Sequence, residues 1–136
     1  MSYEVLAALD PPLGNSASRE FWRGIDRGEL TIPRCTHCGR WQWYPVGTGC
    51  CRAGELVWTA LAGTGRIFTF TTVHFDFLPG VMGATPYDVA LIEMDGAEGV
   101  RLVGLLALAE PVIGEGVRVE FIEGPRHKFP IFVESK

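Results

Sequence analysis

The sequence predicts a mainly β protein in which an N-terminal helix and a cysteine knuckle precede a barrel of five to six strands. The chain has 136 residues, enough for one compact domain. All four cysteines lie between Cys35 and Cys51. After them, stretches rich in Val, Ile, Thr and aromatic residues alternate with glycine-bearing turns. We expect an arm over 1–14, the helix over 15–30, the knuckle over 31–58 and the barrel over 59–136, packed as one unit.

The first two segments are predicted as an arm and a short helix. Residues 1–14 end in DPPLG, whose prolines and glycine exclude a continuous helix. The following run places Phe21 and Trp22 on one side, and Gly28 can end the helix. Gly24 costs such a helix about 1 kcal/mol relative to alanine. We therefore expect the helix to be held by docking Trp22 against this chain or a partner protein.

The knuckle carries the strongest local motif. Cys35-Thr36-His37-Cys38-Gly39 has zinc-knuckle spacing, because two residues between the thiolates let both sulfurs face one ion. The other two cysteines, Cys50 and Cys51, are adjacent, so both reach one ion only through a sharp turn. Three alternatives stay open: a four-thiolate site, a three-thiolate site completed by His37 or another group, and no metal. A zinc ion coordinated by four thiolates has no open coordination position and would therefore have a structural role.

The strands follow at 56–61, 66–75, 87–95, 100–108 and 117–123, with a shorter stretch at 129–133. Apolar and charged residues alternate most clearly over 117–121, as expected for a half-exposed antiparallel strand. The stretch 100–108 is more continuously apolar, with Arg101 as its one charged residue, and should be more central, whereas Pro130 places the last strand at an edge. Without a long crossover helix, these short strands favour an OB-fold barrel, with a β-sandwich as the alternative.

Charge and composition exclude several function classes. With 47% hydrophobic and 21% charged residues, the chain can form a packed core. Its net charge of −4 disfavours binding to a polyphosphate. No apolar stretch reaches the length of a membrane span and no signal sequence is recognised, so we expect a cytoplasmic protein. No catalytic residue is predicted, because His74 lacks a neighbouring Ser, Cys or paired carboxylate and favours a structural role.

The order of these segments resembles a known family. Between about Ser18 and Val133, a Phe-Trp helix is followed by GELTIPRC, the CxxCG knuckle, WQWYP, a second cysteine cluster, IFTFTTVH, PYDVALIEMD, VRLVG and IGEGVRV. This order is similar to the rubredoxin-like zinc-ribbon plus OB-fold family long catalogued as a domain of unknown function. The chain departs from the family at the second metal pair. Counting back from Trp58 puts Cys51 on the last ligand position and leaves Thr48 where a cysteine is usual.

The resemblance implies an accessory subunit of a thiolase-fold (lipid-transfer-protein-like) enzyme. The chain would be a required but non-catalytic part of an aldolase (lyase) or thiolase complex, with the catalytic residues on the partner. It would stabilise that partner and help form an acyl-CoA channel, in steroid or lipid side-chain degradation. The expected ligands are a structural zinc on Cys35, Cys38, Cys50 and Cys51, and a CoA thioester bound by the hetero-oligomer.

Candidate contacts to acyl-CoA or the partner are mainly aromatic, apolar or basic: Trp22, Trp41, Trp43, Tyr44, Arg66, His74, Phe77, Leu78 and Met82. The segment 76–86 carries three of them on a glycine- and proline-rich backbone, and it either covers an acyl chain or partner or folds over one end of the barrel. The compact basic group at 126–128 is interpreted as a solvated turn rather than a phosphate contact.

Two other functions stay open as alternatives. The chain is either a stand-alone acyl-CoA-binding protein or, less favoured by its charge, a nucleic-acid-binding zinc-ribbon/OB module. The second alternative relies on Phe68, Phe70 and Phe75 as rings on which bases could stack.

Overall fold

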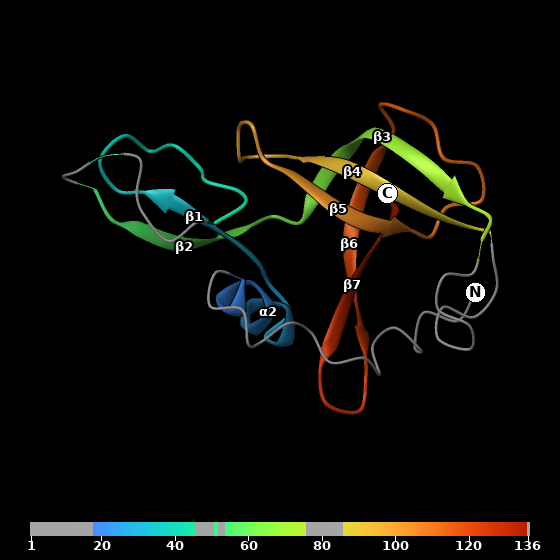
Figure 1. Cartoon of the computed structure of the whole chain (residues 1–136), viewed down its shortest axis with the longest axis horizontal. Coiled ribbons are helices and arrows are strands. Elements are labelled where there is room, and N and C mark those ends of the chain that lie inside the picture. Colours follow the sequence, from blue (N-terminus) through green and yellow to red (C-terminus); the bar gives the residue numbers. More distant parts are fainter. Residues whose placement is uncertain (1–17, 46–50, 52–53, 76–85, 136) are drawn as a thin grey trace.

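The fold consists of a two-stranded sheet, one helix and a barrel (Figure 1). The computed structural model describes residues 18–45, 51, 54–75 and 86–135. The predicted arm at 1–14 lies outside the described residues. Helix α2 lies against the sheet and against one barrel strand, so it joins the two parts. No helix in the described part of the chain has the length and apolarity to span a membrane.

Helix α2 spans Arg19–Asp26, inside the predicted range of 15–30 but shorter. Gly28 follows it at φ 79°, a left-handed conformation that glycine adopts without strain and that commonly ends helices. Phe21 and Ile25 are buried in the main core, while Trp22 is half-buried. The predicted docking of the helix is therefore confirmed within this chain.

Gly24 has a packing role within α2. A Cβ atom at this position would lie 2.8 Å from Oγ1 of Thr31 and 3.2 Å from the carbonyl oxygen of Glu29. Both contacts are tighter than ordinary van der Waals packing. The glycine therefore lets the chain after the helix pass close to the helix backbone, which offsets its low helix propensity.

The two-stranded sheet pairs β1 (Leu30–Cys35) with β2 (Leu56–Leu61) in antiparallel register. β1 was not predicted from the sequence, because five of its six residues are buried and no polar alternation marks it. The bounds of β2 agree with the predicted strand at 56–61. Its predicted place in the barrel was wrong, since β2 pairs with β1 and the barrel begins at the next strand.

The barrel is closed and has five strands in the order β3-β4-β5-β7-β6. This result confirms the predicted OB-type barrel and excludes the β-sandwich. The strands are β3 (Thr64–Val73), β4 (Tyr87–Met94), β5 (Arg101–Leu106), β6 (Gly116–Glu123) and β7 (Lys128–Glu134). Only β5 and β7 pair in parallel, and β3 closes the barrel by pairing with β6.

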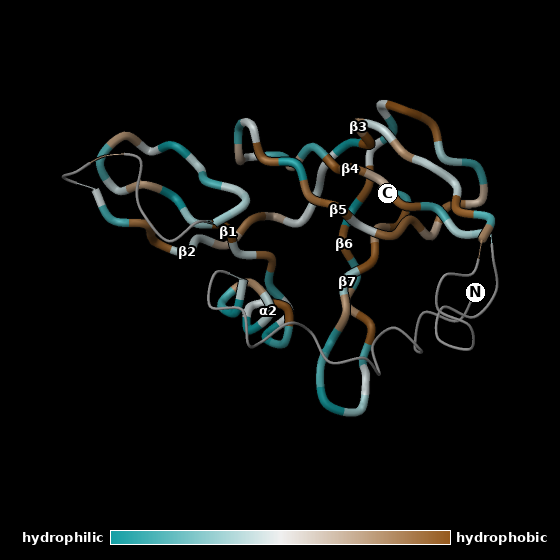
Figure 2. Tube along the Cα trace, viewed as in Figure 1, coloured by the Kyte–Doolittle hydropathy of each residue, from teal (hydrophilic) through white to brown (hydrophobic). Residues whose placement is uncertain are grey.

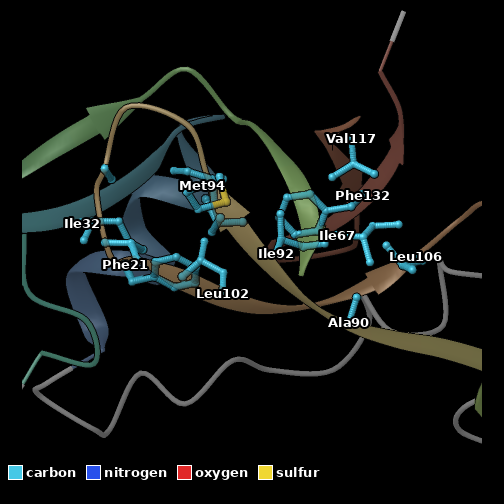
Figure 3. Close-up of a cluster of buried hydrophobic side chains, with 14 residues drawn as sticks. Phe21, Ile32, Ile67, Ala90, Ile92, Met94, Leu102, Leu106, Val117 and Phe132 are labelled. Carbon is cyan, nitrogen blue, oxygen red and sulfur yellow. The ribbon is translucent and has the colours of Figure 1, made fainter. Parts of the chain in front are cut away.

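The core fills the barrel and continues toward α2 (Figure 3). Phe132 lies at its centre, 2% exposed, among residues such as Ile67, Ile92 and Val117. Gly104 provides the space, because a Cβ atom there would lie 2.5 Å from two ring carbons of Phe132. Hydrophobic residues follow the barrel strands, and hydrophilic residues gather at the turn joining β6 and β7 (Figure 2). Each buried large side chain contributes about 1.5–3 kcal/mol to folding.

The last strand was predicted at an edge because of Pro130, and the closed barrel corrects this. β7 pairs with β6 along its length, from Val117↔Glu134 to Glu123↔Lys128. Its pairing with β5 is confined to Leu106↔Phe132. Pro130 precedes this point, so its missing N–H removes no β5–β7 bond and the strand can join the barrel.

Asp26, at the end of α2, ties the helix to the start of β7. Its carboxylate lies 2.9 Å from Nδ1 of His127 and accepts a 2.9 Å hydrogen bond from the backbone N–H of Lys128. Burial alone would raise the pKa of Asp26, but these hydrogen bonds and the neighbouring positive charges outweigh it and lower the pKa. Two of the three residues in the predicted solvated turn therefore anchor the helix.

Candidate functional site

Three cysteines from two separate loops converge beside the two-stranded sheet. The sulfur atoms of Cys35, Cys38 and Cys51 all lie within 4.8 Å of one another. Cys35 is buried at the end of β1, Cys38 is exposed, and Cys51 is half-buried ahead of β2. Cys50 lies outside the described residues, so its predicted ligand role stays a prediction. The sequence spacing thus located the cluster, and the fold brings in Cys51 as its third member.

The backbone around this cluster suits a metal ion. Gly39 N–H donates to the carbonyl of Cys35, and Cys35 N–H donates to the carbonyl of Arg40, both at 2.9 Å. A tetrahedral zinc ion with Zn–S bonds of about 2.3 Å places its sulfurs about 3.8 Å apart. Gly54 leaves the necessary space, because a Cβ atom there would lie 2.5 Å from Sγ of Cys35. The residues present therefore fit a thiolate-bound zinc ion.

An apolar cleft of about 420 Å³ opens between α2, the segment after the knuckle, and the outer face of β4 and β5. Among the residues that the structure describes, its lining contains no ionisable acid, base or thiol other than the phenol of Tyr44. The lining residues are Ser18, Phe21, Trp22, Trp43, Tyr44, Val89, Leu102, Val103, Gly104, Leu105, Phe129 and Pro130. Such a lining favours an apolar occupant over a charged one.

One wall of the cleft is a continuous run of aromatic rings. Phe21 contacts Trp22 and Trp43, with ring centroids 5.3 and 5.0 Å apart. Trp22 in turn lies 6.1 Å from Phe129, and Trp43 lies 5.4 Å from Tyr44. The opposite wall is aliphatic, and Val103 at its rim is 72% exposed. The arrangement is a slot with a rigid aromatic side and an open mouth.

A larger, charged groove of about 950 Å³ lies beside the knuckle. Arg34 and Arg40 line one side of it, and the guanidinium of Arg34 lies 4.8 Å from the centre of the Trp41 ring. The connection between β4 and β5 forms the other side and carries two acidic residues, at 95 and 98. Trp43 lines both this groove and the apolar cleft, so the two hollows adjoin at its indole.

The fold gathers some predicted contact residues and separates others. Trp22, Trp43 and Tyr44 line the apolar cleft, and Trp41 lines the groove. Arg66 lines neither hollow and donates to the carbonyl of Gly114 at 3.1 Å. His74, exposed after the end of β3, also lines neither. Phe77, Leu78 and Met82 lie outside the described residues.

The aliphatic half of the cleft was not predicted, although the apolar stretch that forms it is visible in the sequence. Val103 and Leu105 alternate with core residues of β5, so this strand is apolar on both faces. Continuous apolarity over 100–108 was interpreted as a central position in a sheet. In a closed barrel no strand is central, and the second apolar face of β5 instead lines the cleft.

The three phenylalanines considered for base stacking do not share one surface. Phe70 packs against the main core. Phe68 is 44% exposed and is covered by the guanidinium of Arg101, 3.9 Å from its ring centre. Phe75 is 67% exposed just beyond β3. This arrangement offers no row of open rings for successive bases.

A cysteine knuckle joined to a closed five-stranded barrel defines the chain as a zinc-ribbon/OB-fold protein. The family models agree: the rubredoxin-like zinc ribbon domain of ChsH2 matches residues 22–57, and the C-terminal OB-fold domain of ChsH2 matches residues 58–122. The chain therefore belongs to the ChsH2 family, also known as DUF35. The resemblance identified from the sequence is confirmed.

Known relatives place this membership in context. A DUF35 domain-containing scaffold protein of Methanocaldococcus jannaschii is 31% identical over 109 residues, covering 74% of this chain and 72% of the relative. A solved structure described as the Ltp2-ChsH2(DUF35) aldolase matches with a TM-score of 0.77 and 28% identity, covering 92% of this chain and 98% of that one. A DUF35 protein of unknown function from Sulfolobus solfataricus shares the fold, with a TM-score of 0.57, 17% identity, and coverage of 77% and 78%.

Proposed function

We propose that this chain is a non-catalytic accessory subunit of a thiolase-fold enzyme that acts on acyl-CoA. The enzyme would be a retro-aldolase or thiolase of steroid or lipid side-chain degradation, with its catalytic residues on the partner. The observation that carries the proposal is the apolar cleft, which can accommodate a substrate, while its described lining includes no histidine, carboxylate, lysine or thiol that could activate the hydroxyls of Ser18 and Tyr44. The family relatives support it, since one is described as a scaffold protein and another as part of an aldolase.

The cleft suits the acyl part of such a substrate. Its volume of about 420 Å³ lies in the usual range of roughly 300–1,000 Å³ for small-molecule sites. The open mouth at Val103 and Tyr44 lets a partner surface complete the cavity. In the complex, the chain would therefore form one side of the acyl-CoA channel.

The charged head of the substrate would lie outside the cleft. No cationic side chain is found among the described residues that line the apolar slot, so these residues offer no favourable contact to a phosphate group. Arg34 and Arg40 line the adjoining groove and supply positive charge for phosphates. Trp43 marks the boundary, with the acyl chain on one side of its indole and the head on the other.

Zinc would have a structural role in this proposal. Cys35, Cys38 and Cys51 would hold the ion, with a fourth ligand from the second cysteine loop. A thiolate-bound zinc stabilises the knuckle to which the aromatic segment is attached, because Gln42 N–H donates to the carbonyl of Pro33 at 2.9 Å. The ion would thus fix one wall of the cleft without taking part in the reaction.

The proposal is tested by co-expressing the chain with thiolase-fold proteins of the same genome. Val103→Asp places a charge at the rim of the cleft, and we expect the purified complex to bind long acyl-CoA at least about tenfold more weakly. Val112→Asp is the matched control, because Val112 is 61% exposed and lines neither hollow. Calorimetry with short and long acyl-CoA separates contact with the acyl chain from contact with the head.

Two outcomes contradict the proposal. If no thiolase-fold protein co-purifies and none changes activity in the presence of the chain, the accessory role is wrong. If the isolated chain binds acyl-CoA as tightly as any complex does, it is a stand-alone acyl-CoA-binding protein.

A further inference from the structure

The two-stranded sheet has an outer edge on the β2 side. Thr36 N–H donates to the carbonyl of Glu55 at 2.9 Å, and the register of β1 with β2 continues this pairing. Hydrogen-bonded and non-bonded pairs alternate in antiparallel sheets, so Val57, Thr59 and Leu61 face β1 with their backbone groups. The N–H and C=O groups of the intervening residues, Leu56, Trp58 and Ala60, therefore face away from β1.

The opposite edge of the same sheet is covered. Cys35 N–H donates to the carbonyl of Arg40, and Gln42 N–H donates to the carbonyl of Pro33, both at 2.9 Å. The segment after the knuckle thus runs along the second half of β1 and occupies outer backbone groups of Pro33 and Cys35. No comparable segment pairs with β2 in the described part of the chain, where β1 is its one strand neighbour. Within the described residues, the sheet is therefore covered near the end of β1 and open along β2.

The open edge lacks the features that natural proteins use to prevent pairing. β2 reads LVWTAL, six residues without a charge, a proline or a glycine. Val57 is 48% exposed, and Ala60 is also exposed. Exposed edges are usually interrupted by lysine, proline or a bulge, because unpaired N–H and C=O groups are a template for another strand. β2 retains such a template over its whole length.

We propose that the outer edge of β2 binds an extended segment of the enzyme subunit by strand addition. This inference rests on the proposed function and adds the means of attachment. Only an extended chain can match three N–H and three C=O groups repeating every two residues, about 6.8 Å apart. The segment should be uncharged and rich in β-branched residues, because its neighbours on the two faces would be Leu56 and Trp58 on one and Val57 on the other.

A second copy of this chain fits the edge less well than an unlike partner. Two copies would bring together chains that each carry a net charge of −4. Mutual repulsion of that kind disfavours self-association through a short edge. The enzyme subunit of the proposed complex is therefore the occupant, and self-pairing becomes an outcome that the test can detect.

Hydrogen exchange at single amides tests strand addition directly. In the isolated chain, the amides of Val57 and Thr59 should be protected by β1, while those of Trp58 and Ala60 exchange freely. In the complex with the enzyme subunit, Trp58 and Ala60 should become protected as well, at least about tenfold. A complex that forms while these two amides keep exchanging overturns the strand addition and leaves the proposed function intact.

Three substitutions at residue 60 give an independent measurement. Ala60→Pro removes an outward N–H without removing a β1–β2 hydrogen bond, and should weaken the complex about tenfold or more. Ala60→Val is the control, because it keeps the N–H and should bind like the unmodified chain. If the proline variant does not fold, Ala60→Lys replaces it and should also weaken binding. Equal affinity of all variants, or protection of Trp58 that appears with dimerisation of the isolated chain, overturns the inference.

Discussion

Gly54 is the position where a single methyl group should disable the cysteine cluster. In Gly54→Ala, the new Cβ would lie 2.5 Å from Sγ of Cys35, 3.0 Å from Cβ of His37 and 3.3 Å from the backbone nitrogen of His37. The sulfur and the added methyl must separate by 0.5 Å to reach 3.0 Å, below which real Cβ contacts essentially never fall, and by 0.9 Å to reach an ordinary contact of 3.4 Å. Cys35 is buried, which restricts any compensating movement.

This displacement is large compared with the tolerance of a metal site. Zn–S bonds keep their length of about 2.3 Å to within about 0.2 Å. Even the smaller separation of 0.5 Å is more than twice that tolerance, so either Cys35 leaves the ion or the loop carrying residue 54 moves with Cys51. Overpacking of this kind also costs about 1–3 kcal/mol of folding free energy.

We expect Gly54→Ala to contain much less zinc than the unmodified chain after purification in zinc-supplemented medium. Elemental analysis measures the content, and thermal unfolding with and without a chelator measures the linked stability. Gly116→Ala is the control, because its nearest contact would be an ordinary 3.6 Å to Cβ of Ser135. Stoichiometric zinc of unchanged affinity in Gly54→Ala would show that the cluster does not need this space and would refute the reasoning.

Two further perturbations address the second cysteine loop and the helix anchor. Cys51→Ser should lose zinc in the same elemental analysis, whereas retention of full zinc in this variant would remove Cys51 from the site. Asp26→Asn should lower the stability measured by urea unfolding at pH 7 by about 1 kcal/mol, because the hydrogen bonds to His127 and Lys128 weaken. Folding lowers the pKa of Asp26 below 3.8, so its contribution to stability is present above that pH and disappears as the pH falls through the lowered pKa. The free energies of unfolding of Asp26→Asn and the unmodified chain, measured as a function of pH, should therefore converge in acid.

The barrel could be predicted from the sequence because its strands have clear local patterns. In β6, Val117, Val119 and Phe121 point to the core while Arg118 and Glu120 form an ion pair of 2.9 Å on the outside. This alternation is visible in the sequence as period two. Closure of the sheet was equally accessible, since several short strands without a crossover helix have few other arrangements.

The cleft could be predicted only in part, because its walls come from distant segments. The aromatic residues of one wall stand out in the sequence, and three of them, Trp22, Trp43 and Tyr44, were predicted as contact residues. Val103 and Phe129 are ordinary strand residues, and only the packing of α2 against β7 brings their surface opposite the aromatic rings. That packing depends on Asp26 and His127, which are 101 positions apart and share no local pattern.

The edge of β2 was inaccessible for a different reason. A strand next to a cysteine knuckle reads the same whether it opens a barrel or borders a small sheet. The distinction depends on which chain segment covers which side, and the cover over β1 is made by main-chain bonds of Arg40 and Gln42. Backbone hydrogen bonds leave no signature in side-chain composition.

The shared position of Trp43 makes it a natural optical reporter. Its indole borders a charged hollow on one side and an apolar one on the other, so filling either changes the polarity around the same chromophore. With the three other tryptophans replaced by phenylalanine, its emission would report both events in one spectrum. A blue shift marks exclusion of water from the apolar side, and quenching marks a ligand arriving beside the arginines.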